Sequence, residues 1–445
     1  MMPAGGHDDL RLTNRLDGIV RDFSLADIGA GAPASGDLSV ETHTSRRRRR
    51  GFSPQDFNGL ATLTLVEEDG LLRWDYQPPV HGIPSRRSRR RAAHPIGAAV
   101  VHEFSFTETP PNKVISALEG LDAKLTPDAG LRRLQSGRFV PVQQPAISGR
   151  VLLLVHGTFS KSEMFLDELN AIPVGKDFLQ RATQKYDAVL AFDHPTLSVS
   201  PWINALDLEV ALAGVSGSID VVSHSRGGLV VAWWLRNAKR RVDNVVFVGT
   251  PMEGTSLASP ANLRSALSGL ANVFKGLEAA SAVASTVVPF MTIVTGLSRI
   301  LGGVLQLGAS TPLADAAVAI VPGLAAQSRV GNNSELERLT RLSWVSTPTV
   351  YAVTSNFAPS ESDADWWKIW KLLSRPTEKM LNWGADAIFN ENNDLVVNTQ
   401  SMTRLCRTKI DASRTHDFGN SQSVHHCNYF RQPETIALLS RAFNL

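Results

Sequence analysis

Short runs of apolar residues recur along the chain between residues 149 and 355, and each run ends at a small or polar residue. Unbroken runs of this length are typical of strands buried on both faces of a parallel sheet. The segments between them, such as "SEMFLDELNAI" (162–172), have helical spacing. Alternating strands and helices predict an α/β fold, with a mostly parallel sheet covered by helices on both faces. The five runs are 149–157, 187–195, 218–225, 243–251 and 347–355.

A different pattern precedes these runs, because apolar and polar residues there alternate with a period of two, which predicts strands. The stretches are "GLATLTLVEE", "GLLRWDY" and "AAVVHEFSFTE", between residues 59 and 108. We therefore expect a small β-rich or α+β domain over residues 56–147, ahead of an α/β domain over 148–445. Residues 1–55 are rich in Gly, Ala, Asp and Arg with weak periodicity, which predicts a poorly ordered basic segment.

A long apolar insertion of helical pattern, roughly 256–345, separates the fourth run from the fifth. An insertion above the strand ends has the position of a cap or lid, which is how we interpret it. A plain helical subdomain that extends the core is the alternative. Within it, no charged residue lies between Glu278 and Arg299, a length that could just span a bilayer. The many Ala, Ser and Thr residues, together with Pro289, favour a buried or lid helix instead.

The overall charge gives no sign of a polyanion-binding protein, since the 445 residues carry a formal net charge of only +3. Two basic runs stand out, the five arginines at 46–50 and "RRSRRR" at 86–91. They could bind an anionic membrane surface, which fits the chain better than nucleic acid does, and solvated loops are the alternative.

Cysteine content and the N-terminus favour a cytoplasmic protein, peripheral at a membrane if the arginine runs bind one. Cys406 and Cys427 are the two cysteines, so the sequence indicates no disulfide framework, although one bridge would be open to them in an oxidising compartment. The N-terminal "MMPAGGHDDLRL" has no apolar core of the kind that a secretory signal needs.

The stretch "VVSHSRGGLV" (221–230) has the order strand, sharp turn, helix, with Ser225 at the apex of the turn. This is the context of the G-x-S-x-G nucleophile elbow, whose crowding demands small residues two positions before and after the serine. Gly227 satisfies the second position, and Ser223 replaces the usual glycine at the first. We expect Ser225 to be a nucleophile. The alternative is a polar turn that resembles the elbow motif but has no catalytic role.

An oxyanion hole is expected from two backbone N–H groups. "VLLLVHGT" ends an apolar run at His156-Gly157, and the N–H of Thr158 follows directly. The N–H of Arg226 comes just after the nucleophile, and two such donors would stabilise a tetrahedral intermediate. We interpret His156 as a structural residue beneath the site.

A catalytic triad also needs an acid and then a base, in that chain order. Asp394 stands after an Asn-rich loop and before "LVV", which favours it over its competitors Asp386 and Glu391. The base would be one of the adjacent pair His425 and His426 in "HHCNYF".

These motifs together resemble the α/β-hydrolase superfamily, and within it the bacterial lipase-like serine hydrolases. The resemblance covers residues 150–445 and includes "LLLVHGTF", "VGTPMEGT" and "NDLVV" besides the elbow. It implies the α/β-hydrolase fold and favours His426 as the base, with His425 as the alternative. It further implies hydrolysis of a small-molecule or lipid ester through an acyl-enzyme, with no cofactor and no metal. Calcium near "NENND" is the alternative, and the apolar insertion suggests a hydrophobic acyl chain.

Two other kinds of function remain open. The same residues could serve an amidase, a peptidase or an acyltransferase, which differ only in leaving group and acceptor. A catalytically inactive hydrolase-fold protein that binds anionic membrane through the arginine runs is the non-enzymatic alternative. The intact triad weighs against it.

Overall fold

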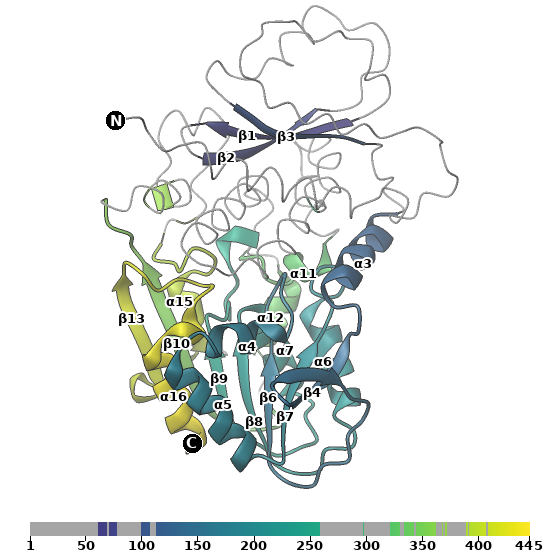
Figure 1. Ribbon diagram of the computed structural model, residues 1–445, viewed down its shortest axis with the longest axis vertical. Coiled ribbons are helices and arrows are strands. Elements are labelled where there is room, and N and C mark those ends of the chain that lie inside the picture. The colour runs from purple at the N-terminus through teal and green to yellow at the C-terminus, as the bar shows by residue number, and fades with distance from the viewer. Residues whose placement is uncertain are drawn as a thin grey trace, which may run out of the picture. The chain divides into compact units, whose positions relative to one another are not determined.

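The computed structural model describes residues 61–68, 71–77, 99–106, 113–258, 321–329, 333–341, 344–361, 391–405 and 408–445, with residues 297, 367, 370, 371 and 389 (Figure 1). The chain divides into two units, one of residues Met1–Gly120 and Leu267–Ala317, the other of Leu121–Ala266 and Val318–Leu445. Several sequence predictions lie outside the described residues: the N-terminal segment 1–55, both arginine runs, most of the lid insertion with its uncharged segment, Cys406 and Asp386.

The larger unit contains an eight-stranded sheet in the order β13-β10-β9-β8-β6-β7-β4-β5. Its six strands from β13 to β7 are parallel throughout, and β4 and β5 add an antiparallel hairpin at the edge. All five apolar runs form strands of the parallel part, so the predicted α/β fold with a mostly parallel sheet is confirmed. The eight strands are β4 (Gly130–Gln135), β5 (Arg138–Pro141), β6 (Val151–Val155), β7 (Ala188–Asp193), β8 (Ile219–His224), β9 (Val242–Val248), β10 (Thr349–Phe357) and β13 (Thr415–Ser421).

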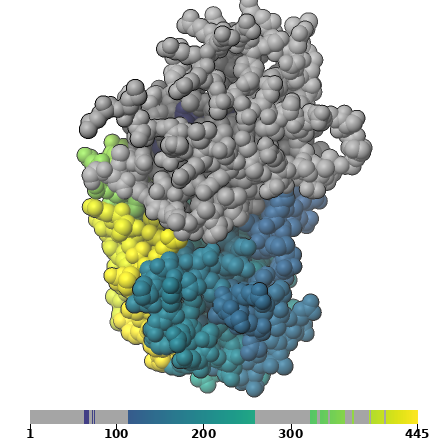
Figure 2. Space-filling view, viewed as in Figure 1, coloured from purple at the N-terminus to yellow at the C-terminus, as the bar shows by residue number. Residues whose placement is uncertain are grey.

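Helices cover both faces of this sheet, as the apolar runs predicted. In β6, Val151 and Leu153 face one core cluster together with α6, α7 and α12, whereas Leu152 and Leu154 face a second cluster with α4, α5 and α16. The C-terminal helix α16 packs beside α5, where yellow and teal surfaces adjoin in Figure 2. The helices are α4 (Glu163–Leu169), α5 (Pro173–Lys185), α6 (Pro201–Ala211), α7 (Arg226–Trp234), α11 (Pro322–Ala325), α12 (Ser334–Arg341), α15 (Thr399–Met402) and α16 (Pro433–Phe443).

The domain boundary expected between residues 147 and 148 is wrong, because the large sheet begins upstream of it. Strand β4 pairs antiparallel with β7, and Leu131 lies opposite Phe192. Each strand of this edge hairpin buries a single residue, Leu131 in β4 and Phe139 in β5. These two strands lack the continuous apolar run that marked the strands of the parallel sheet, so the sequence pattern did not assign them to it.

The smaller unit contains an antiparallel sheet in the order β2-β1-β3, at the three places where the alternating pattern predicted strands. Its strands are β1 (Ala61–Glu68), β2 (Leu71–Gln77) and β3 (Ala99–Phe106). The division between the two units after Gly120 falls within helix α3 (Val114–Leu125). Among the residues described in both units, no helix is long and apolar enough to cross a bilayer.

Short elements complete the described part of the chain. They are the two-stranded sheet of β11 (Arg404–Leu405) and β12 (Thr408–Lys409), and the 3-10 turns η3 (Ser256–Ala258), η5 (Ala412–Arg414) and η6 (Tyr429–Arg431).

Candidate active site

Ser225 lies at the apex of a sharp turn between strand β8 and helix α7. Its backbone has φ +53° and ψ −130°, a conformation that non-glycine residues rarely adopt and that is found where a fold holds strain at a functional site. The Ser225 N–H donates to the Val248 carbonyl at 2.9 Å, and the Gly228 N–H donates to the Ser225 carbonyl at 2.9 Å. Ser223, by contrast, is a buried residue within β8.

Close backbone packing explains the small residues around Ser225. A Cβ atom on Gly227 would lie 2.4 Å from the carbonyl oxygens of Val155 and His156, and one on Gly157 would lie 2.7 Å from the Ser225 Cβ. Both distances are shorter than any van der Waals contact allows. The turn therefore sits directly against the loop that follows β6, as the two sequence motifs require.

Asp394 and His426, which are 32 residues apart, are brought into direct contact. Asp394 Oδ2 accepts a hydrogen bond from His426 Nδ1 at 2.8 Å, and the Asp394 carbonyl accepts from the His426 N–H at 3.0 Å. The other carboxylate oxygen, Oδ1, accepts from the N–H groups of Val396 at 3.1 Å and Val397 at 2.7 Å. The Asp394 carboxylate is thus held by its own loop, and it contacts the His426 ring through Nδ1.

Tyr429 is a further partner of the acid that the sequence analysis missed. Its hydroxyl donates to Asp394 Oδ2 at 2.8 Å. Burial and the Asp394 carboxylate raise the pKa of Tyr429 well above its usual value, so the hydroxyl stays protonated and remains a donor. The only signal in the sequence was its place three residues after His426.

His224, the residue before Ser225, contacts His426. Its Nε2 lies 2.9 Å from the His426 carbonyl oxygen, and the two rings have centroids 4.8 Å apart. Burial lowers the pKa of His224 to about 3. A Cβ atom on Gly249, just after β9, would lie 3.2 Å from His426 Nδ1. The proposed base therefore lies at the carboxyl ends of β8 and β9, on the same edge of the sheet as Ser225.

The competing residues have other partners. The ring nitrogens of His425 contact the Asn428 side chain at 3.1 Å and the Cys427 N–H at 3.3 Å, and burial lowers the pKa of His425 to about 3. Glu391 forms an ion pair with Arg329 at 2.8 Å. These contacts leave His426 as the histidine that is paired with Asp394.

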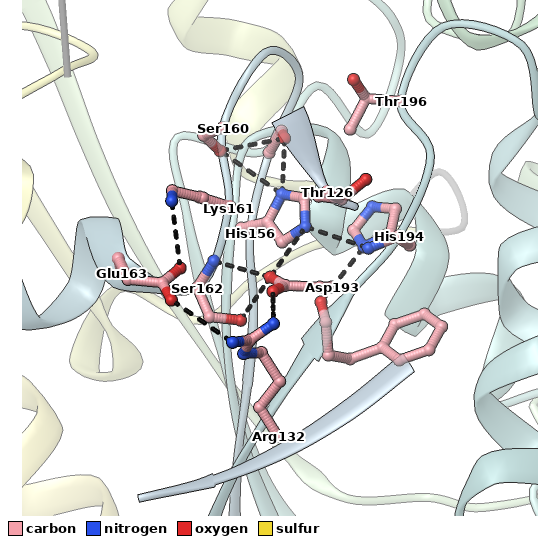
Figure 3. A network of polar contacts seen from close by, with 12 residues as sticks. Thr126, Arg132, His156, Ser160, Lys161, Ser162, Glu163, Asp193, His194 and Thr196 are labelled. Carbon is pink, nitrogen blue, oxygen red and sulfur yellow. Dashed lines mark hydrogen bonds and ion pairs between the residues drawn. The ribbon is translucent and has the colours of Figure 1, made fainter. Parts of the chain in front are cut away.

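His156 contacts the loop that follows β6, in keeping with our interpretation of it as a structural residue. Its Nδ1 lies 2.9 Å from the Gly157 carbonyl, its Nε2 accepts the His194 N–H at 3.2 Å, and the two imidazoles stack at 4.2 Å (Figure 3). Burial lowers the pKa of both rings, so both are neutral at neutral pH. Asp193 anchors the far end of the loop by accepting the Ser162 N–H at 2.7 Å.

The two residues expected to supply oxyanion donors, Arg226 and Thr158, follow Ser225 and Gly157 in the chain. Arg226 is the first residue of α7, so its N–H has no acceptor within the helix. The Thr158 side chain is held by Gln327, whose Nε2 donates to Thr158 Oγ1 at 3.0 Å. The Arg226 side chain is fully buried, and its Nη2 donates to the Asn204 side chain at 2.8 Å.

A buried carboxylate from α3 fixes the loop that follows β7, which sequence reasoning did not anticipate. The two oxygens of Asp122 accept the N–H groups of Thr196 at 2.8 Å, Leu197 at 3.1 Å and Ser198 at 2.7 Å. Three successive N–H groups converging on one carboxylate hold this loop beside the site.

Several solved structures are similar to the chain at low sequence identity. The mature form of the lipase BlEst2 from Bacillus licheniformis is 15% identical, over 68% of this chain and 95% of that chain, with a TM-score of 0.35. Lipase 1 from Pelosinus fermentans is 15% identical, over 64% and 94%, with a TM-score of 0.34. A hydrolase from Oleispira antarctica is 12% identical, over 74% and 98%, with a TM-score of 0.32.

No curated protein matches the chain. Residues 130–444, which make up most of the chain and begin with the β4–β5 hairpin, match the family described as "Domain of unknown function (DUF7379)", and the protein therefore belongs to that family.

Proposed function

We propose that this protein is a serine hydrolase that cleaves carboxylic esters through Ser225, His426 and Asp394. The observation that carries the proposal is the 2.8 Å contact between Asp394 and His426 at the sheet edge where Ser225 occupies a strained turn. A serine at a sharp, strained turn and a paired acid and base are what nucleophilic catalysis by serine requires.

In the proposed reaction, Ser225 Oγ attacks the ester carbonyl while His426 Nε2 takes its proton. Asp394 orients the imidazole through Nδ1 and stabilises its protonated form. The N–H groups of Thr158 and Arg226 stabilise the negative oxygen of the tetrahedral intermediate. His426 then protonates the leaving alcohol as the carbon–oxygen bond breaks, which leaves an acyl-Ser225 ester. A water molecule, deprotonated by His426, attacks this ester and releases the acid and the free serine.

The substrate class follows from the apolar insertion at 256–345, which suggests that the acyl group is hydrophobic. An ester is the first choice because alkoxide leaving groups need the least assistance. Anilides of the same acids in the assay distinguish amidase activity, and hydroxylamine as acceptor distinguishes acyl transfer.

Fluorophosphonate labelling with p-nitrophenyl ester hydrolysis tests the proposal. We expect the wild type to be labelled and Ser225→Ala to be silent, with activity lowered at least about 10³-fold. Ser223→Ala is the matched control, since this serine lies inside β8, and it should still be labelled. His426→Ala should abolish turnover and His425→Ala should not. An unlabelled wild type, or equal labelling of Ser225→Ala, would exclude a serine hydrolase.

A further inference from the structure

We propose that His224 is a positioning residue that sets the place of the base relative to the nucleophile, an inference that rests on the proposed function. The polar contact that carries it joins His224 Nε2 to the His426 carbonyl oxygen at 2.9 Å. The two residues are 202 positions apart in the chain, and His224 is the direct neighbour of Ser225.

The contact defines the tautomer of His224. A carbonyl oxygen can only accept, so the proton of the neutral ring must reside on Nε2. Burial lowers the pKa of His224 to about 3, so the ring remains neutral at neutral pH and adds no charge beside the proposed base. Its Nδ1 has no hydrogen-bond partner among the residues that the structure describes. The bond to His426 is therefore the polar contact for which this buried imidazole is placed.

The described residues make three hydrogen bonds with His426, and two of them come from Asp394. Its side chain accepts from Nδ1 at 2.8 Å and its carbonyl accepts from the His426 N–H at 3.0 Å. These two bonds make the acid and the base one rigid unit, but they do not tie that unit to Ser225. The third bond, from His224, links it to the elbow itself.

Strand pairing fixes the backbone around His224, so that its ring can position the base. It is the last residue of β8, it lies opposite Val248 of β9, and the next N–H, that of Ser225, donates to the Val248 carbonyl at 2.9 Å. The ring also packs edge-on against Phe430 at 5.8 Å. A displacement of about 1 Å between reacting groups can lower a rate by about 10²-fold, so this link is expected to affect turnover.

Two substitutions separate positioning from packing. His224→Phe keeps an aromatic ring but has no donor, whereas His224→Gln removes the ring and can place an amide N–H near the position of Nε2. We expect His224→Phe to lower kcat for p-nitrophenyl esters by about 10- to 100-fold with KM changed less than about twofold. His224→Gln should recover most of that loss, even where its melting temperature is the lower of the two.

A second measurement does not depend on activity. In protein with ¹⁵N-labelled histidine, we expect the nitrogen chemical shifts of His224 to report the Nε2–H tautomer, and a Nδ1–H tautomer would overturn the proposal. Equal kcat for His224→Phe and wild type, or equal losses in Phe and Gln variants, would also overturn it. Failure of the wild type to react with fluorophosphonate would refute the serine hydrolase instead, and the tautomer measurement would still decide the His224 contact.

Discussion

Replacing the buried carboxyl of Glu168 should make the protein more stable at neutral and alkaline pH. Glu168 lies in α4, and its Oε2 accepts the Phe430 N–H at 3.2 Å in the turn that follows the proposed base. Burial raises the pKa of Glu168 to about 8, although the positive charge of Arg431 partly opposes this. Glu168→Gln keeps an oxygen that can accept from Phe430 and removes the titrating group.

The size of this effect on the free energy of unfolding follows from the difference between the pKa of Glu168 in the unfolded chain and in the folded protein. The ordinary pKa of 4.5 applies to the unfolded chain, and the folded pKa is about 8. Below pH 4.5 both states hold the proton, so the carboxyl adds no pH dependence. Between these values only the folded state holds the proton, so stability falls as pH rises, and it levels off above about pH 8. A shift of this size is worth at most about 5 kcal/mol, at about 1.4 kcal/mol for each pKa unit.

Urea unfolding of the wild type and Glu168→Gln at about pH 4, 6 and 8 measures this effect. We expect the variant's advantage in free energy of unfolding to be smallest at pH 4 and to grow steadily towards pH 8. Glu434→Gln, at an exposed position in α16, is the matched control and should show no such growth. A difference between wild type and Glu168→Gln that stays constant across these pH values would refute the reasoning.

Three further substitutions test the site's framework. Tyr429→Phe removes one donor to the buried Asp394 carboxylate and should lower the free energy of unfolding by about 1.5–3 kcal/mol, measured by urea titration, and should slow ester turnover. Gly157→Ala places a Cβ 2.7 Å from the Ser225 Cβ, so the rate of fluorophosphonate labelling should fall more than about tenfold while the far-ultraviolet spectrum is retained. Asp122→Asn leaves one oxygen for three converging N–H groups and should lower the melting temperature, with unchanged melting counting against this role.

The strand pattern was largely predictable because it depends on local composition. An apolar run such as that around Val151–Val155 is buried on both faces wherever the sheet places it, so its secondary structure can be read without knowing its neighbours. The elbow was predictable for a similar reason, since a sharp turn excludes bulky residues at positions fixed relative to Ser225. The β4–β5 hairpin was assigned to the wrong domain because its strands have no continuous apolar run, the signal that marked the parallel strands, and its pairing with β7 is a contact distant in sequence.

The sequence by itself determined the α/β class, the parallel strands and Ser225 as the apex of the turn, since each follows from residues within about ten positions of one another. Only the tertiary structure decided which of two adjacent histidines meets Asp394, and that Tyr429 and His224 complete this contact from either side. These are pairings between segments separated by up to 202 residues. The physical reason is the folding of the parallel sheet, which brings the carboxyl ends of β8 and β9 and the loops after β10 and β13 to one edge. A local sequence pattern contains no information about which distant segments meet there.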